Sequence, residues 1–454
     1  MPLQGASFIR TQGRTAAVIG IVVSDDDGAS RRIGDALLAQ STWEQCESRV
    51  WRTTDGAFSM RQFDDLHLNL ERVDEEFSDP AILVFVSRHA GDTGPLLTAH
   101  FPGNVGSADY GGEPHTVPTA APQALSQIYS ALNRFVPDGF DVGIECTHHG
   151  PSRIDTPCLF VEIGSGPEQW NDDAAAAAVA KAVLRLEPVP HQPERTIIGI
   201  GGSHYAPRFE RILASTPWTI GHIAADWALD EVPANAHEAT LTMLFDRSGA
   251  NRAVIDGTYP GLEKQIEECG YAVVSETWLR ETGSTPLPLV TALENALGSI
   301  DAGTRIGSLQ VGSPEDLRTL NLPNALLSAA EGVDRAATVA AIDANSVAYG
   351  TRENGNRLRG DVLIPADMND FVVVESLRPI LEDGYDAVHI TDTEISIEKR
   401  RFDPDKATKR GVSEGPLFGK LANGEVIEIN GKEIHPSDVA TTEVETIAIG
   451  VEDE

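Results

Sequence analysis

The chain has 454 residues, and 69 acidic against 35 basic side chains give it a formal net charge of −34. A chain of this length can bury large hydrophobic cores, and we expect it to form two domains. No apolar run reaches the length needed to span a bilayer, which argues against a membrane protein.

The acidic residues are spread along the whole chain, and arginine is preferred over lysine, whose first occurrence is Lys181. This composition indicates a surface that stays hydrated in concentrated salt, because self-repulsion would weaken the fold in dilute buffer. We therefore predict a protein from a salt-loving archaeon. The same charge disfavours a nucleic-acid partner, since phosphate contacts through Lys and Arg weaken as the salt concentration rises.

Hydrophobic periodicity predicts alternating strands and helices over the first part of the chain. Residues 1–14 are polar and lack periodicity, so we expect a loose segment there. The predicted strands cover residues 16–23, 81–86, 140–144, 158–163 and 196–200. The predicted helices cover residues 32–40, 122–135, 172–186 (with Asn171 as N-cap), 208–215 and 262–268. This alternation indicates an α/β fold with a mainly parallel sheet covered by helices on both faces.

A long Gly/Pro-rich connection covers residues 102–122, which is long enough for a functional loop. A separate C-terminal block of α+β type is predicted for residues 301–454 from typical domain sizes. Within it we expect a helix at 324–342, a strand at 371–374, and a hairpin of residues 426–429 and 433–434 turning at Asn430-Gly431.

The cysteines show no Cys-x-x-Cys spacing and no secretory leader precedes them, so reduced thiols in a cytoplasmic protein are expected. They are Cys46, Cys146, Cys158 and Cys269. Cys146 lies in a histidine-rich motif and could be a thiolate ligand. A small buried residue on a strand is the favoured interpretation, because free cysteine is among the most buried residue types.

The densest group of ionisable side chains is the motif that runs from Glu145 to Ser152, which contains His148 and His149 and is followed by an apolar run that carries Glu162. Neighbouring strands that end in His and Glu at one edge of a sheet would form a pocket of nitrogen and oxygen ligands, which zinc accepts. Alternatively, the two histidines occupy a polar turn in which one of them caps a backbone group. Both interpretations stay open at this level.

Three further apolar runs each end in a histidine within a turn of small residues: His89, His100 and His204. In open α/β sheets, sites form outside the carboxyl ends of the strands, where such turns converge. We therefore predict a metal site whose ligands are His89, His148, His149 and His204.

Several uncommon motifs in one order make the chain resemble the archaeal or plant-type D-aminoacyl-tRNA deacylases. The resemblance covers roughly residues 16–300 and is carried by residues 87–89, 98–104, 145–151, 160–165 and 201–207. It implies a three-layer α/β/α, phosphorylase/hydrolase-like catalytic domain at residues 15–300, and two zinc ions per chain. It also implies hydrolysis of the ester between a D-amino acid and the 3′-terminal ribose of mischarged tRNA, with the acceptor end of that tRNA as the partner.

For such an esterase we expect zinc to activate the attacking water. The predicted catalytic residues are His148, His149, Glu145 and Glu162, where either glutamate acts as general base or orients a ligating histidine. The predicted substrate-binding residues are Arg88, His100, Ser165, Gly166 and Tyr205. We expect a monomer, with a homodimer as the alternative.

Two other functions stay open. A nucleoside phosphorylase or amino-hydrolase would need a phosphate cradle, for which Arg88 and the turn at residues 164–166 are the candidates. A non-catalytic tRNA-binding or zinc-storage protein would bind without turnover. The C-terminal block contains a segment, residues 415–425, that resembles a short motif of tRNA 3′-processing nucleases, although the metal motif of those nucleases is absent. We expect this block either to help hold tRNA or to add stability.

Overall fold

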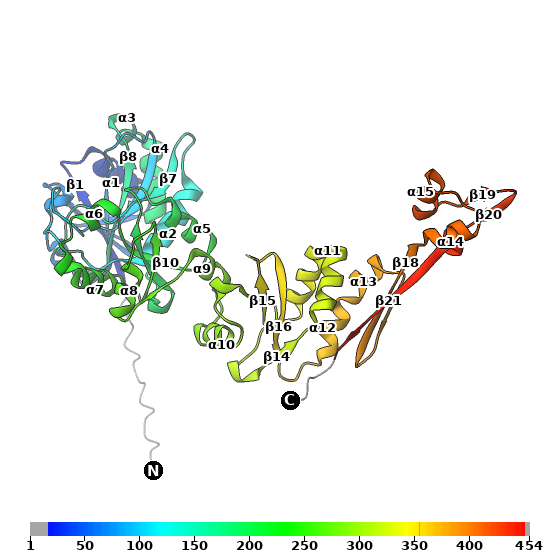
Figure 1. The fold of residues 1–454 in the computed structure, drawn as a ribbon. Helices are drawn as coiled ribbons and strands as arrows, with labels where there is room; N and C mark the ends of the chain where they lie inside the picture. Colours follow the sequence, from blue (N-terminus) through cyan, green and yellow to red (C-terminus); the bar gives the residue numbers. More distant parts are fainter. Residues whose placement is uncertain (1–16, 354, 450–454) are drawn as a thin grey trace, which may run out of the picture. The chain divides into compact units, whose positions relative to one another are not determined.

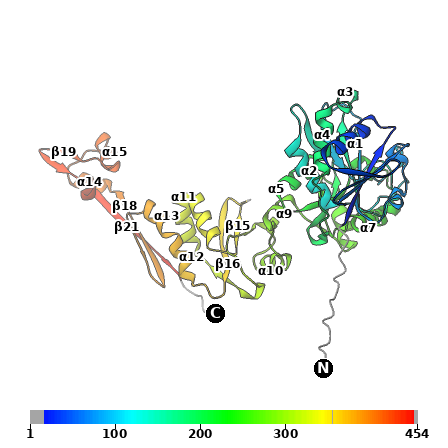
Figure 2. The same ribbon diagram turned by 180° about the vertical axis from the view of Figure 1, so that it is seen from behind.

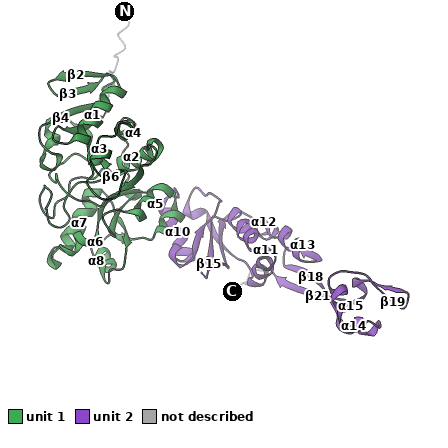
Figure 3. Ribbon diagram, turned by 90° about the horizontal axis from the view of Figure 1, so that it is seen from above, with its two compact units in different colours: residues 1–283 green, residues 284–454 purple. Residues whose placement is uncertain are grey.

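The computed structural model describes residues 17–353 and 355–449, so the predicted loose segment at residues 1–14 lies outside the described residues. The chain forms two compact units that separate between Gly283 and Ser284 (Figure 3). This point comes before residue 300, where the sequence places the boundary of the catalytic domain. None of the described helices is long and apolar enough to cross a bilayer.

An eight-stranded mixed sheet forms the centre of the first unit, with the strand order β2-β3-β4-β1-β5-β8-β6-β7 (Figure 1). Its strands are β1 (Val18–Ser24), β2 (Trp43–Glu47), β3 (Val50–Thr53), β4 (Phe58–Phe63), β5 (Pro80–Arg88), β6 (Leu96–His100), β7 (Asp141–Ile144) and β8 (Cys158–Gly164). The middle strands β4, β1, β5 and β8 run parallel. Strand β6 is antiparallel to β8 and parallel to β7. The mainly parallel α/β arrangement predicted from the sequence is confirmed.

A second, fully parallel sheet has the order β10-β9-β11-β12. Its strands are β9 (Thr196–Gly201), β10 (Thr219–Ala224), β11 (Arg252–Asp256) and β12 (Ala272–Val273). The segment after β7 joins the two sheets: the amide of Cys146 donates to the carbonyl of His204 (2.9 Å), and the amide of Thr147 donates to the carbonyl of Ile223 (2.8 Å). The histidine-rich motif therefore lies where the two sheets meet.

Amphipathic helices cover these sheets, and the pair α1 and α4 pack against each other (Figures 1 and 2). The helices of this unit are α1 (Gly28–Gln40), α2 (Pro122–Phe135), α3 (Pro167–Trp170), α4 (Asp173–Val183), α5 (Pro207–Ser215), α6 (Asp226–Asp230), α7 (His237–Ser248), α8 (Leu262–Glu268) and α9 (Glu276–Thr282). Helix α2 buries Leu125, Ile128 and Leu132 at the spacing of one helix face, as its sequence predicts.

The predicted N-cap of α4 is wrong. Asp172, not Asn171, caps this helix, because the Asp172 side chain accepts a hydrogen bond from the amide of Ala175 (2.8 Å). Asn171 instead closes the preceding short helix α3, and its side chain donates to the carbonyl of Pro167 (2.7 Å).

The second unit combines α10 (Leu287–Leu297) with an antiparallel sheet of order β13-β15-β16-β14, a three-stranded sheet of order β17-β18-β21 and a hairpin. Its strands are β13 (Thr304–Ile306), β14 (Leu317–Asn321), β15 (Ala348–Arg352), β16 (Arg357–Pro365), β17 (Ala387–Ile390), β18 (Glu394–Phe402), β19 (Ile427–Ile429), β20 (Lys432–Ile434) and β21 (Ala440–Ala448). Its other helices are α11 (Asn324–Ala344), α12 (Asp370–Ser376), α13 (Arg378–Gly384), α14 (Pro404–Lys409) and α15 (Pro416–Ala422).

Two local predictions for this unit have opposite outcomes. The hairpin is confirmed: β19 pairs with β20, and Asn430 (φ 51°) and Gly431 (φ 75°) form the turn with the positive φ angles that this dipeptide favours. The strand predicted at residues 371–374 is wrong, because these residues belong to α12. The Asn369 side chain caps this helix, and burial of the adjacent Val373 and Val374 is helical rather than alternating.

Candidate metal centre

Five histidines and two glutamates from separate strand ends form one cluster in the first unit. His89 follows β5, His100 ends β6, and His204 follows β9. Glu145, His148 and His149 follow β7, while Glu162 lies within β8 and pairs in register with Ser87 of β5 and Thr98 of β6. The structure therefore brings together the imidazoles and carboxylates that lie far apart in the sequence.

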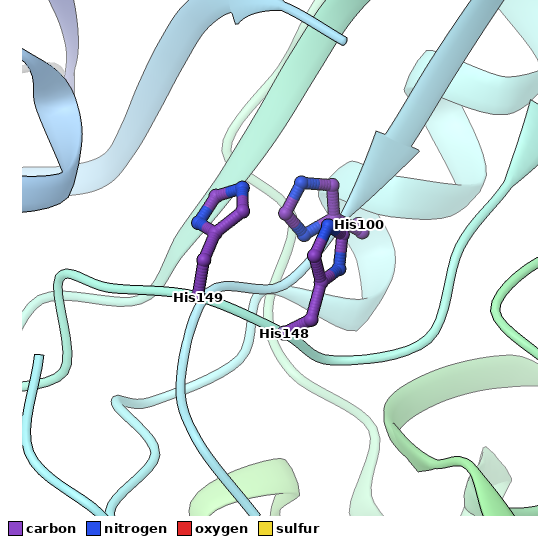
Figure 4. A group of neighbouring side chains, drawn as sticks. All are labelled: His100, His148 and His149. Carbon is purple, nitrogen blue, oxygen red and sulfur yellow. The ribbon is translucent and has the colours of Figure 1, made fainter. Parts of the chain in front are cut away.

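One part of the cluster consists of three imidazoles, His100, His148 and His149 (Figure 4). The ring centroids of His100 lie 4.2 Å from those of His148 and 4.8 Å from those of His149. One ring nitrogen from each residue lies within 4.8 Å of the others. These three side chains are thus close enough to share one cation.

Backbone carbonyl groups fix the tautomers of these three rings. The Nδ1 atoms of His100, His148 and His149 donate to the carbonyls of Phe101 (3.0 Å), Cys146 (2.9 Å) and Gly150 (2.8 Å). When neutral, each ring then carries its lone pair on Nε2, which is the form that binds a metal. His149 also has a φ of 48°, a left-handed backbone conformation that costs energy in a residue other than glycine.

The second part of the cluster consists of His89, Glu145 and His204. Nε2 of His204 donates to Oε2 of Glu145 (2.7 Å), and Nδ1 of His89 lies 3.3 Å from Oε1 of the same carboxylate. Nε2 of His89 forms a hydrogen bond with the hydroxyl of Tyr205 (2.8 Å). His204 is the most accessible member, since 35% of its side chain is exposed, whereas the Glu145 side chain is fully buried.

Opposite charges balance one another inside the cluster. Burial opposes ionisation of Glu145, yet the hydrogen bond from His204 and the close contact with His89 hold its pKa well below the usual range. Burial would likewise raise the pKa of Glu162, but the close contacts of His100 and His89 with its carboxylate lower it. For His89, burial lowers the pKa, and the close contacts with the two glutamates more than offset this, raising it to about 11.

The pKa values of the three-imidazole group are shifted in different directions. The contacts of His100 with Glu162 outweigh its burial and raise its pKa. Burial and the neighbouring His100 charge lower the pKa of His148 well below its usual value, and that of His149 to about 4. His148 and His149 are therefore neutral near pH 7 and can act as ligands.

Two buried atoms of the cluster have no hydrogen bond from any described residue: Nε2 of His100 and Oε1 of Glu145. An unsatisfied buried polar atom costs about 1–3 kcal/mol, so natural structures rarely keep one without a reason. One atom belongs to each part of the cluster, and both are metal-ligating types. The donor set fits one or two divalent cations that prefer nitrogen and oxygen.

Cys146 lies within reach of His148 and His204. Burial, followed by the charge of Glu145, raises the pKa of its thiol to about 12, which keeps it protonated. A protonated thiol is a poor metal ligand, in agreement with the predicted role of Cys146 as a small buried residue, although Cys146 follows β7 and does not lie on a strand.

The residues predicted to bind substrate lie in different environments. His100 is fully buried within the three-imidazole group, and Tyr205 contacts His89. The Arg88 guanidinium lies 5.3 Å from the centre of the Trp170 ring. The Ser165 hydroxyl bonds to that of Thr93 (2.5 Å), and the amide of Gly166 donates to the side chain of Gln169 (3.1 Å). Of these five residues, His100 is a member of the cluster and the Tyr205 side chain contacts it. The side-chain and amide contacts given above for Arg88, Ser165 and Gly166 are with other residues.

Two residues that support the site had no predicted role. The Ser87 hydroxyl donates to Oε1 of Glu162 (2.5 Å), a contact set by the pairing of β5 with β8. His222 in β10 is buried, and its ring bonds to the hydroxyl of Thr147 (3.0 Å) and to the carbonyl of Pro118 (2.9 Å). A histidine inside the apolar sequence of β10 indicates a buried polar side chain, so the sequence could have marked His222 as a structural histidine.

Comparison with known proteins identifies the family. The profile described as D-aminoacyl-tRNA deacylase matches residues 76–273. A D-aminoacyl-tRNA deacylase of Natronomonas pharaonis is 45% identical over 93% of this chain and 98% of its own length. The chain belongs to the D-aminoacyl-tRNA deacylase family. The resemblance inferred from the motifs is thereby confirmed, as is the prediction that the protein is an enzyme.

Other family members support this assignment. The deacylase of Halorubrum lacusprofundi is 44% identical and covers 93% of this chain and 95% of its own. That of Methanoregula boonei is 33% identical and covers 82% and 86%. A solved structure described as a conserved protein of unknown function matches 59% of this chain and 98% of its own with 28% identity and a TM-score of 0.54. The haloarchaeal relatives agree with the salt adaptation inferred from composition.

Proposed function

We propose that this chain hydrolyses the ester between a D-amino acid and the 3′-terminal ribose of mischarged tRNA, releasing the free D-amino acid and the tRNA. The observation that carries the proposal is the cluster of five imidazoles and two carboxylates, in a chain whose relatives are named for this deacylation. The acceptor end of the tRNA is the proposed partner, and the first unit is proposed to have the three-layer α/β/α fold of the phosphorylase/hydrolase type.

We propose zinc as the metal, held by His100, His148 and His149. A set of three imidazole nitrogens is typical of catalytic zinc sites. Zinc in such a site supplies a water whose pKa is near 7 and polarises the carbonyl of the ester. His89, Glu145 and His204 could hold a second ion, but their mutual hydrogen bonds favour a role in proton transfer.

The proposed general base is His204. Its Nε2 donates to Glu145, which leaves the lone pair of Nδ1 able to accept a proton from the attacking water. Glu145 stabilises the resulting imidazolium, and the same ring can then return the proton to the ribose oxygen that leaves. His204 suits this role because 35% of its side chain is exposed to the solvent from which a substrate would arrive.

This assignment revises several roles expected from the sequence. Glu145 keeps a catalytic role. His148 and His149, expected both as ligands and as catalytic residues, are assigned only as ligands, and the ligand role expected for His89 and His204 is replaced by proton transfer. His100 joins them instead of contacting substrate. Glu162 accepts from Ser87 and lies 3.6 Å from Nδ1 of His89, so we assign it a positioning role.

The phosphorylase alternative has less support. The amide of Gly166, which would have to bind phosphate, already donates to the side chain of Gln169. Its helix α3 has four residues, and the Arg88 guanidinium stacks on Trp170. A phosphate cradle at this turn would require these contacts to break.

The deciding experiment compares the hydrolysis of D-tyrosyl-tRNA and L-tyrosyl-tRNA in concentrated salt, with and without a chelator. We expect faster hydrolysis of the D-substrate, loss of activity with the chelator and recovery with zinc. His148→Ala should remove activity, while the matched control His191→Ala, which changes an exposed histidine outside the cluster, should keep it.

Each contrary result has a defined meaning. Equal rates on both enantiomers would contradict the proposed function. Activity that resists the chelator would contradict the role of zinc. A metal content of two ions per chain would assign His89, Glu145 and His204 to a second ion instead of proton transfer.

A further inference from the structure

Two aromatic side chains are conspicuous for their exposure. Tyr110 is 72% exposed and Trp227 is 44% exposed, and the other large apolar side chains that are exposed in the described part of the chain are all valines. Leaving an aromatic ring in water forgoes the free energy of its burial. Exposed aromatic rings therefore suggest a binding surface if they gather at one place.

Tyr110 is attached to the side of the cluster that contains His149. It lies in the Gly/Pro-rich connection between β6 and α2, and its carbonyl accepts a hydrogen bond from the amide of Gly150 (3.0 Å). The same connection returns to the motif at Gly103, whose amide donates to the carbonyl of His149 (2.6 Å). The backbone that carries Tyr110 is thus bonded directly to the segment that carries the histidines.

Close packing holds this part of the connection in place. Gly111 and Gly112, which follow Tyr110, have φ angles of 77° and 79°. A Cβ atom at Gly111 would lie 2.3 Å from the carbonyl oxygen of Leu68, and one at Gly112 would lie 3.1 Å from the Cα atom of Gly150. Only glycine allows this approach, which fixes the Tyr110 backbone beside the cluster.

Trp227 is attached to the other side of the cluster. The residue before it, Asp226, donates its amide to the carbonyl of Gly202 (3.0 Å), two positions before His204. The side chain of Glu231, which follows α6, accepts a hydrogen bond from the amide of Ser107 (2.7 Å). This contact links α6 to the connection that carries Tyr110, so the two exposed rings lie on mutually bonded segments that flank the histidines.

We propose that Tyr110 and Trp227 are stacking platforms for the unpaired bases at the 3′ end of the tRNA substrate. The proposal rests on the proposed function and adds the means of recognition. Stacking suits this protein because its net charge of −34 opposes phosphate binding, which concentrated salt weakens further. Aromatic rings bind unpaired bases by stacking, which needs no neutralisation of phosphate charge.

The test measures binding of a fluorescent single-stranded RNA with the terminal tRNA sequence, by anisotropy in concentrated salt. Tyr110→Ala and Trp227→Ala should each raise Kd by about fivefold to a hundredfold, because stacking on one ring contributes about 1–3 kcal/mol per base. Tyr110→Phe and Trp227→Phe should stay close to the wild type. Val189→Ala, which changes a side chain that is 45% exposed, is the matched control for loss of apolar surface.

Kinetics with D-aminoacyl-tRNA complete the test: the alanine variants should raise KM and leave kcat nearly unchanged. Unchanged Kd and KM in both alanine variants would overturn the stacking proposal and leave the deacylase function standing. If RNA binding depends on the two rings but no hydrolysis of D-aminoacyl-tRNA is detected, the proposed deacylase function fails while the stacking role of Tyr110 and Trp227 is supported. If sedimentation shows that the variants lose self-association while RNA affinity is unchanged, the rings belong to a contact between copies, and the proposal fails.

Discussion

Zinc should stabilise the first unit selectively, and this can be measured without any substrate. In the absence of metal, Nε2 of His100 and Oε1 of Glu145 are buried without a hydrogen bond from the described residues. Zinc on the three-imidazole group would satisfy Nε2 of His100, and one unsatisfied buried atom of this kind costs about 1–3 kcal/mol. A ligand at a thousand times its Kd adds about 4 kcal/mol to the stability of the folded state.

Differential scanning calorimetry in concentrated salt can separate the melting of the two units. For a unit that ends at Gly283, about 4 kcal/mol corresponds to a rise in Tm of roughly 7 °C. We expect zinc to raise the Tm of the first unit only, since the cluster lies entirely before Gly283. His148→Ala should abolish the shift, whereas His191→Ala should preserve it. An equal shift in both variants, or a shift of both units, would refute the assignment of the three-imidazole group.

Three further predictions concern stability. Burial lowers the pKa of His222 to about 4, whereas the same histidine in the unfolded chain has a pKa near 6.5. Protons therefore bind the unfolded chain more readily than the folded one. The free energy of unfolding is unaffected by this group above about pH 6.5, and it falls by about 3 kcal/mol as the pH drops to about 4. Urea unfolding of His222→Gln should therefore depend less on pH over this range, and an unchanged slope would contradict the reasoning. Gly111→Ala should destabilise the protein more than Gly94→Ala. Both glycines have a positive φ, but only at Gly111 would the added Cβ clash with a backbone atom, the carbonyl oxygen of Leu68. Equal urea midpoints for the two variants would argue against this clash. Asp172→Ala should lower the free energy of unfolding, measured in urea, by about 0.5–2 kcal/mol, and Asn171→Ala should lower it by less. The reverse order would indicate that Asn171 is the N-cap.

The elements best predicted from the sequence are those with strong local signals. Helix α2 occupies residues 122–135 as predicted, because Pro122 suits its first turn and one face is apolar. Strands β5 and β8 are continuous apolar runs, typical of central parallel strands. The Asn430-Gly431 turn likewise needs no distant contact to be recognised.

Elements that depend on distant partners could not be predicted in this way. The edge strand β2 is mostly exposed, so its residues show no apolar pattern. The run Phe371–Val374 has strand-like composition, yet the Asn369 cap and burial against the rest of its unit make it helical. The sequence also gives no sign that β6 enters the large sheet antiparallel to β8.

The same limit applies to the site. Strand ends followed by histidines could be recognised one at a time, but their grouping depends on topology. Because β6 runs against β8, His100 lies opposite Phe160 and beside His148 and His149, although it was expected to contact substrate. Likewise, the contact between Ser87 and Glu162 follows from the register of β5 and β8, which the sequence does not contain explicitly.

The conflict between an acidic protein and an anionic substrate is resolved within the site itself. The carboxylates of Glu145 and Glu162 both lie against the imidazolium of His89, so the two buried carboxylates are partly compensated where the ester would bind. Next to Glu145 lies the partly exposed His204, and the proposed contacts with the RNA are the exposed rings of Tyr110 and Trp227. Contacts of this kind do not depend on counterion release, so recognition by them would persist in the concentrated salt that the rest of the surface requires.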